Sequence, residues 1–284
     1  MSGTLYLCAT PIGNREDITL RALRVLREAD VIAAEDTRRS RILLDSYEIK
    51  KPLVSYHEHN KYERAEELVG RLLDGENIAL ITDAGTPVIS DPGEVLVIRA
   101  REAGIPVTAL PGPCALVDAL SLSGIYGRRF AFEGFLPVSG PERREVREAL
   151  RREERTIILY EAPHRLLRTL DDLREVLGDR RVSVCRELTK IHEEVLSLTL
   201  EEAAAYYRRA EPRGEFVLVL AGRPAAEILA EKRQRWEDLS PAEHLQQVMA
   251  EGLDRKAALK RVAAERGADR RQLYRELFVE EKTE

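Results

Sequence analysis

The chain has 284 residues, of which 44% are hydrophobic and 33% are charged, and its formal net charge is −5. The apolar fraction excludes a largely disordered chain, and the length exceeds that of most single hydrophobic cores, so we expect two globular domains. No apolar run approaches the roughly 18 residues that a membrane-spanning helix needs. The N-terminus lacks the basic segment of a signal peptide. Three separated cysteines, Cys8, Cys114 and Cys185, form neither a disulfide framework nor a zinc motif, which favours a reducing cytoplasm.

The first part of the chain alternates strand and helix patterns with short connections. Strands are predicted at residues 5–9, 31–34, 53–56, 78–82 and 107–110, and helical patterns lie between them, among them 40–47 and 63–73. Such alternation predicts an α/β domain, at residues 1–113, whose parallel sheet is covered by helices on both faces.

The second part alternates less strictly. Strands are predicted at 130–132, 156–160, 182–185, 195–200 and 216–221, with helices at 141–152 and 165–177. Two of these strands have only a short helix between them, which predicts a mixed sheet in a second α/β domain at residues 114–223.

The remaining residues, 225–284, show helical patterns only. Asp254 and Asp269 are predicted to cap two short helices around Gly267, an arrangement typical of a helix-turn-helix unit. From Arg255 to Arg275 there are eight basic and two acidic residues, a local charge of +6. This segment is either a nucleic-acid-binding arm or a solvated helical cap.

Three loops rich in Gly and Pro, at residues 10–14, 83–93 and 111–115, follow predicted strands of the first sheet. The carboxyl edge of an open α/β sheet is where ligands bind, so the three loops predict a ligand crevice. Neither a Gly-x-Gly-x-x-Gly fingerprint nor a Walker-type Gly-Lys-Ser/Thr occurs. The loops therefore favour an uncharged or cationic ligand over a dinucleotide, and Asp83 would complement a positive charge.

Seven motifs occur in a fixed order along the chain: 7–14 (LCATPIGN), 34–38 (AEDTR), 82–93 (TDAGTPVISDPG), 110–113 (LPGP), 132–137 (FEGFLP), 160–165 (YEAPHR) and 186–190 (RELTK). Together they resemble the tetrapyrrole-methylase-like S-adenosylmethionine methyltransferases over residues 4 to 222. Within that family they are most similar to members that act on ribosomal RNA, whose helical C-terminal extension the tail also resembles.

The resemblance implies two α/β domains of the tetrapyrrole methylase type, S-adenosyl-L-methionine in the cleft between them, and a homodimer without a metal or a membrane. It implies 2′-O-methylation of a cytidine ribose in the 16S ribosomal RNA of the small subunit, in the decoding region. The expected cofactor-binding residues are Pro11, Asp83, Ala84, Gly85, Thr86, Ile89, Cys114, Ala115, Glu161, Leu188 and Phe216. Many relatives carry Ser or Thr where Cys114 stands, and a thiol is a weaker hydrogen-bonding group.

A base is needed to remove the proton of a ribose hydroxyl. Lys190 is the leading hypothesis, because it is the one lysine between Lys61 and Lys232 and a desolvated lysine can lose its proton, whereas an arginine cannot. The alternative is that Lys190 pairs with Glu187 or Glu193, or contacts RNA phosphate. Glu161, Glu187 and Asp36 are the other candidate bases.

Several polar residues are candidate RNA contacts: Arg38, His57, Asn60, Arg255, Arg270 and Arg271. Arginine forks match phosphate oxygens. His57 and His59 would share a strand face, but no third residue completes a metal site. Six arginines alternate with glutamates and are expected on a solvated helix face: Arg143, Arg144, Arg147, Arg151, Arg152 and Arg155. His244 is expected to be exposed.

Two other functions fit the same patterns. A tetrapyrrole C-methyltransferase, of the precorrin or uroporphyrinogen type, would share the cofactor loops but would need no basic helical arm. A non-catalytic RNA-binding assembly protein would share the arm but would not bind the cofactor.

Overall fold

The computed structural model describes residues 1–234, 236 and 238–278. The chain divides into two compact units, Met1–Gly222 and Arg223–Glu284. Residues 235, 237 and 279–284 of the predicted extension lie outside the described residues. Among the described residues, no helix is long and apolar enough to cross a membrane.

The first sheet is wholly parallel, with strand order β3-β2-β4-β1-β5. Its strands are β1 (Leu5–Cys8), β2 (Val31–Ala34), β3 (Leu53–Ser55), β4 (Ile78–Ile81) and β5 (Val107–Leu110), and the helices that connect them are α1 (Leu20–Glu28), α2 (Thr37–Ser46), α3 (Lys61–Leu73) and α4 (Gly93–Glu102). Helix α2 begins three residues before the predicted 40–47, because the Asp36 carboxylate accepts the N–H groups of Arg38 and Arg39.

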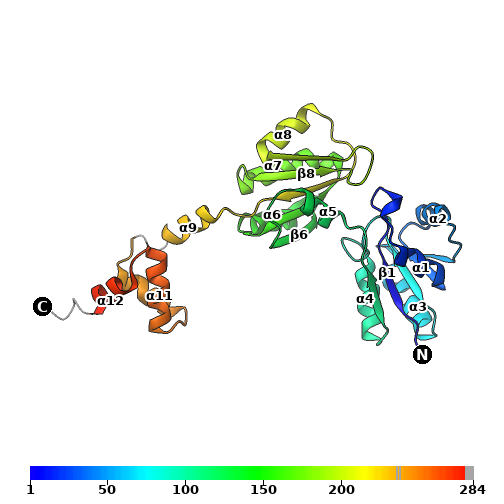
Figure 1. Cartoon of the computed structure of the whole chain (residues 1–284), viewed down its shortest axis with the longest axis horizontal. Helices are drawn as coiled ribbons and strands as arrows, with labels where there is room; N and C mark the ends of the chain where they lie inside the picture. The colour runs from blue at the N-terminus through cyan, green and yellow to red at the C-terminus, as the bar shows by residue number, and fades with distance from the viewer. Residues whose placement is uncertain (235, 237, 279–284) are drawn as a thin grey trace. The chain divides into compact units, whose positions relative to one another are not determined.

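Both faces of this sheet are covered, as the sequence predicts (Figure 1). Alternate residues of β4 separate the two cores: Ile78 and Leu80 pack with α3 and α4, whereas Ala79 and Ile81 pack with α1 and α2. Because β4, β1 and β5 are neighbours, the loops that follow them emerge side by side at the carboxyl edge.

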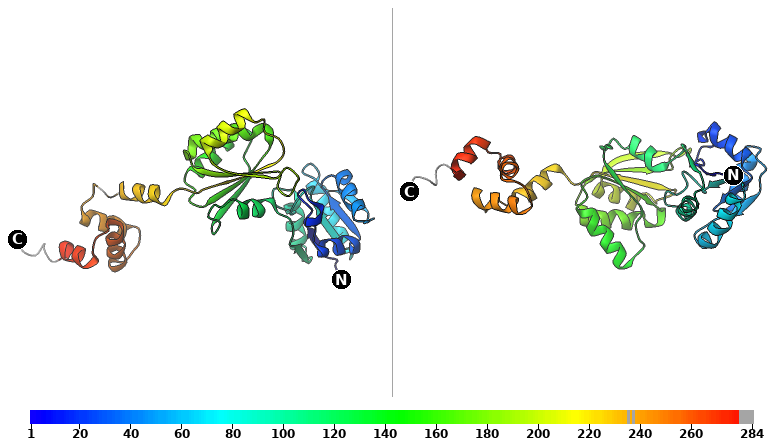
Figure 2. Two further views of the ribbon diagram at one scale, coloured as in Figure 1. Left: turned by 45° about the horizontal axis from the view of Figure 1, so that its top comes forward. Right: turned by 90° about the horizontal axis from the view of Figure 1, so that it is seen from below.

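The second sheet is mixed, with order β6-β7-β10-β8-β9; β6 and β7 pair in parallel and the other pairs are antiparallel. Its strands are β6 (Phe130–Phe135), β7 (Thr156–Glu161), β8 (Arg181–Arg186), β9 (Glu194–Thr199) and β10 (Phe216–Leu220). Helix α5 (Ala115–Leu122) covers one face, and α6 (Gly140–Arg151), α7 (Leu166–Leu177) and α8 (Leu200–Arg209) cover the other (Figure 2). The two predicted α/β sheets are thus confirmed.

The unit Arg223–Glu284 contains α9 (Ala225–Gln234), α10 (Pro241–Ala250), α11 (Arg255–Arg266) and α12 (Arg270–Phe278). Its own core is formed by residues of the last three helices: Leu245, Val248, Ala258, Leu259, Val262, Ala263 and Leu273. Asp254 caps α11, and Gly267 ends it in the left-handed conformation, at φ 62°. The Asp269 carboxylate accepts N–H groups in the first turn of α12.

Two expectations about exposed side chains are wrong. Arg143 is 4% exposed, because its guanidinium pairs with Asp172 of α7 at 2.7 Å and so lies between α6 and α7. His244 is 3% exposed; it lies one turn before Val248 on the buried face of α10 and pairs with Glu265 of α11. Both partners are more than 20 residues away in the sequence, so local charge patterns do not reveal them.

Candidate cofactor site

The three Gly- and Pro-rich loops brace one another at the carboxyl edge of the first sheet. Thr10 and Gly85 exchange two backbone hydrogen bonds, of 2.9 and 3.0 Å, and the Thr10 hydroxyl donates to the Thr82 carbonyl. The Thr86 hydroxyl donates to the Pro113 carbonyl at 2.9 Å. The loops therefore form one rigid wall.

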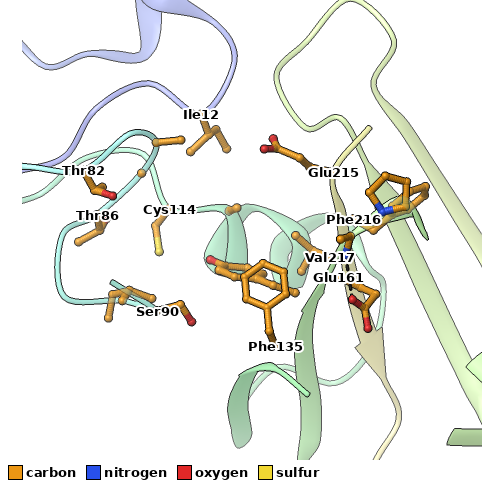
Figure 3. Close-up of a pocket in the computed structure, with 17 residues that line it drawn as sticks. Ile12, Thr82, Thr86, Ser90, Cys114, Phe135, Glu161, Glu215, Phe216 and Val217 are labelled. Carbon is orange, nitrogen blue, oxygen red and sulfur yellow. Dashed lines mark hydrogen bonds between the residues drawn. The ribbon is translucent and has the colours of Figure 1, made fainter. Parts of the chain in front are cut away.

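A cavity of about 450 Å³ lies between this wall and the second sheet. This volume lies within the range of small-molecule sites. Figure 3 shows that side chains from both sheets converge on it. Among the described residues, the lining includes two acidic residues, Glu161 and Glu215, and no basic residue. A cavity with this lining suits a cationic or neutral ligand better than a phosphate.

Eight of the predicted cofactor residues line the cavity: Ala84, Gly85, Thr86, Ile89, Cys114, Ala115, Glu161 and Phe216. Pro11, Asp83 and Leu188 are not among the lining residues. The Asp83 carboxylate accepts the Asp36 N–H and pairs with Arg39 at 3.0 Å, which joins the cofactor loop to α2. Leu188 is buried in the core beneath α5.

The residues that sequence reasoning missed are Ile12, Thr82, Ser90, Phe135, Tyr160, Ala162, Pro163, Glu215 and Val217. All nine adjoin a predicted cofactor residue or occur within a quoted motif, and this proximity was the available signal. Glu215 and Val217 flank Phe216 on both sides. Ser90 belongs to the loop at 83–93 and directly follows Ile89, the last residue of that loop predicted to bind the cofactor.

Tyr160 connects the cavity to the start of α5. Its hydroxyl accepts the Leu116 N–H at 3.2 Å, and its ring packs edge-on against Phe132 and Phe135. Burial raises the pKa of the Tyr160 phenol to about 12, so the hydroxyl stays protonated at neutral pH. Tyr160 therefore fixes the position of Cys114 and Ala115, which line the cavity at the same helix end.

Glu161 is 2% exposed and ends β7. Its Oε1 accepts the Ala162 N–H at 2.8 Å and lies 3.4 Å from Arg165 Nε, and its Oε2 accepts the Thr169 hydroxyl at 2.6 Å. Both oxygens are thus occupied by donors of the protein.

Lys190 bridges two carboxylates, with Nζ 2.8 Å from both Glu187 Oε1 and Glu215 Oε2. Burial alone would lower the pKa of the Lys190 ammonium, but the two carboxylates outweigh burial and raise it. The sequence left open whether Lys190 is a base or pairs with a glutamate, and in the structure it pairs with Glu187. A base would need the opposite shift.

Gly13 allows this cluster to approach the loop after β1. A Cβ at Gly13 would lie 2.4 Å from Lys190 Cγ and 3.0 Å from the Leu188 carbonyl oxygen. The neighbouring Asn14 N–H donates to the Thr189 hydroxyl at 3.0 Å. The absence of a side chain at Gly13 thus lets the two sheets' loops pack together.

The candidate RNA residues of the first unit lie at the same edge of the sheet. The Arg38 side chain is 89% exposed and pairs with Asp36 at 3.2 Å. Asn60 has a local structural role, because it accepts the His57 N–H and donates to the Ser55 carbonyl. The prediction that His57 and His59 share a strand face is wrong: β3 ends at Ser55, and both residues lie in the turn that follows. No described His, Cys, Asp or Glu side chains form a metal-binding group.

In the second unit, Arg270 and Arg271 are exposed in the first turn of α12. Arg255 is exposed too, and its guanidinium lies over the Phe278 ring at 3.8 Å from the centroid. Lys256, Lys260 and Arg275 are also exposed. The positive charge of this unit is therefore on its surface.

The solved structures most useful for comparison have the same fold. Uroporphyrin-III C-methyltransferase from Thermus thermophilus is 23% identical, with a TM-score of 0.57 over 77% of this chain and 97% of that chain. Diphthine synthase is 17% identical, with a TM-score of 0.61 over 77% and 90%.

The sequence comparisons extend over most of the chain. Residues 4–204 match the family described as Tetrapyrrole (Corrin/Porphyrin) Methylases. A protein of Halalkalibacterium halodurans named ribosomal RNA small subunit methyltransferase I is 49% identical over 96% of this chain and 93% of its own length. Its namesake in Thermotoga maritima is 48% identical over 78% of this chain and 99% of its own length. The chain therefore belongs to the tetrapyrrole methylase family, in the branch that includes the proteins named ribosomal RNA small subunit methyltransferase I.

Proposed function

We propose that this protein transfers a methyl group from S-adenosylmethionine to ribosomal RNA of the small subunit, at the ribose 2′-oxygen of a cytidine. The observation that carries the proposal is the acidic cavity beside the braced loops, in a chain 49% identical to a relative named for methylation of that RNA. The ribose oxygen and the cytidine, in the decoding region, come from the resemblance of the seven motifs.

The cavity fits the proposed cofactor in size and charge. S-adenosylmethionine carries a sulfonium and an ammonium group, and among the described residues the lining has two acidic residues, Glu161 and Glu215, and no basic residue that would repel them. Phe135, Tyr160 and Phe216 give it an aromatic wall against which an adenine can pack. A solved uroporphyrin-III C-methyltransferase with the same fold is described as a complex with S-adenosylhomocysteine.

When bound, S-adenosylmethionine supplies an electrophilic methyl group on sulfur. The protein's part is to align the acceptor oxygen with that methyl group and to receive the hydroxyl proton. The sequence predicts Lys190 or Glu161 as the base, but both are engaged by other groups in this structure, which disfavours proton transfer to either: Lys190 by two carboxylates, Glu161 by donors on both oxygens. We therefore expect the cavity to contribute mainly by aligning the acceptor oxygen with the methyl group.

The exposed cations support an RNA substrate. Arg38, beside the cofactor loop, and Arg255, Arg270 and Arg271 of the tail are accessible to phosphate oxygens. His57 and Asn60 lie in the turn after β3, at the carboxyl edge of the same sheet. A homodimer and a cytoplasmic location, both expected from the sequence, stay predictions.

Transfer of tritiated methyl groups to unmethylated small subunits tests the proposal. We expect incorporation into one cytidine, and resistance of its 3′ phosphodiester to alkali, because the 2′-oxygen that attacks this bond is blocked. A labelled base with an alkali-sensitive bond would contradict ribose methylation. Labelling of a porphyrinoid but not of RNA would favour the tetrapyrrole alternative, and failure to bind S-adenosylmethionine would favour the non-catalytic one.

A further inference from the structure

A buried chain of hydrogen bonds runs from the wall of the cavity into the space between α6 and α7. It begins at Glu161, whose side chain is 0% exposed, and passes to Thr169, which is 0% exposed as well. The Thr169 hydroxyl donates to Glu161 Oε2 at 2.6 Å and accepts from Arg143 Nη2 at 3.2 Å. Thr169 is 8 residues away from Glu161 and 26 residues away from Arg143 in the sequence.

Arg143, at the far end of this series of hydrogen bonds, determines which atom donates in each bond. Arg143 has donors only, and it cannot lose its proton in a protein. Its other donors reach Asp172 Oδ2, at 2.8 Å, and the Pro137 carbonyl, at 2.7 Å. The Thr169 oxygen therefore accepts from Arg143, and its single hydrogen is left to donate to Glu161. Rotation of the Thr169 hydroxyl would leave a buried carboxylate oxygen without this donor.

Glu161, at the other end of this series of hydrogen bonds, belongs to the cavity wall. Tyr160, Glu161, Ala162 and Pro163 are consecutive and all line the cavity. The Glu161 carboxylate binds the N–H of Ala162, so the position of the carboxylate fixes the turn from β7 into Pro163. Because both Glu161 oxygens are held by hydrogen bonds, the carboxylate in turn holds the backbone of Ala162 in place.

We propose that Arg143 and Thr169 are positioning residues that, through Glu161, set the wall of the cofactor cavity at residues 160–163. Their effect on methyl transfer is exerted through cofactor affinity, since neither residue lines the cavity. The inference rests on the proposed function, because it takes S-adenosylmethionine as the ligand of this cavity.

The test is calorimetric binding of S-adenosylmethionine to the full chain. Thr169→Val removes the hydroxyl, whereas Thr169→Ser retains it. We expect Thr169→Val to weaken binding about tenfold, because a buried acceptor loses its donor. We expect Thr169→Ser to bind within about twofold of the wild type. RNA affinity should be unchanged in both variants, which separates a positioning effect from a general loss of structure.

Arg143→Met should weaken cofactor binding to a similar degree. Its matched control is Arg147→Met, since Arg147 lies one turn further along α6 and also pairs with Asp172, at 3.4 Å, but has no bond to Thr169. Equal weakening in both arginine variants would overturn the specific role of Arg143. If Arg143→Met does not fold, the Thr169 pair decides: equal binding by Thr169→Val and Thr169→Ser overturns the inference. A wild-type chain that binds no S-adenosylmethionine would instead overturn the proposed function.

Discussion

The two compact units of this chain use charged side chains in opposite ways. Around the cavity of residues 1–222, charges are paired: Lys190 with two carboxylates, Asp83 with Arg39, and Glu161 with donors on both oxygens. In the tail, Lys256, Lys260, Arg270, Arg271 and Arg275 are exposed and form no ion pair with any residue that the structure describes. The charges around the cavity are fixed in advance, whereas these five cations of the tail are available, even though other tail residues such as Arg261 form ion pairs.

This difference matches the two kinds of ligand that the proposed reaction needs. A small cofactor binds well to groups held in place beforehand, because little conformational entropy remains to be lost on binding. A polyanion such as RNA binds through cations that displace counterions from phosphates, and side chains already engaged in ion pairs serve this purpose less well. Changes in the tail should therefore leave cofactor binding unaffected, and changes at the cavity should leave the phosphate contacts of the tail unaffected.

The largest effect is expected from a truncated variant that ends at Gly222 and so lacks the tail. We expect its affinity for small-subunit RNA to fall about 100-fold at low salt, with a shallower dependence on salt, because several phosphate contacts are lost. Its affinity for S-adenosylmethionine should not change, since the tail has its own core. Filter binding across a salt series and calorimetry measure the two affinities. Equal RNA affinity and salt slope in the shortened chain would show that the tail serves another purpose.

A second test addresses the packing of the loops in the first unit. Gly13→Val should lower the free energy of unfolding by about 1–3 kcal/mol, because the new side chain collides with Lys190 and the Leu188 carbonyl. Gly70→Ala is the matched control: Gly70 lies within α3 with no atom within 4 Å of an added Cβ. There we expect stabilisation of about 1 kcal/mol from the better helix former. Urea unfolding measures both, and loss of stability in the two variants alike would contradict the packing argument.

The first sheet and its loops are predictable because their signals are local. Strand–helix alternation predicts a parallel sheet, and Gly85 and Thr86 occur in a loop whose Gly and Pro content is unusual. The positions of Pro11 and Asp83 in such loops are equally visible, but whether a loop residue faces the cavity depends on the bonds between loops. Asp83 faces Arg39 instead, 44 residues away in the sequence.

The aromatic wall shows why the other side of the cavity is harder to predict. Phe132 and Phe135 are three positions apart and would face opposite sides of a regular strand. The register of β6 on β7 shifts between Phe132 and Gly134, so that both rings pack against Tyr160. The bulge also carries Gly134 at φ 61°, where a Cβ would lie 2.7 Å from Ser90 Oγ. Neither the bulge nor this approach has a signal in the strand pattern.

Lys190 tests whether paired charges near the cavity take part in proton transfer. Because its carboxylate partners raise the pKa of the Lys190 ammonium, we expect it to keep its proton at neutral pH. Lys190→Gln should then reduce the methylation rate by about three- to tenfold through the lost ion pairs, and the shape of the pH–rate profile should be retained. Loss of the acidic limb, in which the rate rises as the base loses its proton, with recovery of rate at higher pH, would instead identify Lys190 as the base.

The smallest effect we expect concerns the one buried histidine of the tail. His244 Nε2 lies 3.0 Å from Glu265 Oε2, and its Nδ1 accepts from Arg266 Nε at 3.1 Å. Burial lowers the pKa of His244; Glu265 opposes this, and Arg266 and Arg261 add to it. The folded tail thus favours neutral His244, so its contribution to stability is complete above the ordinary value of 6.5 and is lost as the pH falls below it.

Trp236 reports this transition directly. It is the single tryptophan of the chain, and its ring stacks on His244 with 5.2 Å between centroids. We expect the midpoint of urea unfolding followed by Trp236 fluorescence to decrease between pH 7 and pH 5. In His244→Gln the amide can bond to Glu265 without titrating, so the midpoint should be lower at pH 7 and nearly independent of pH. A midpoint that falls equally in both proteins would assign the acid sensitivity to the carboxylates of the tail and leave His244 a purely structural role.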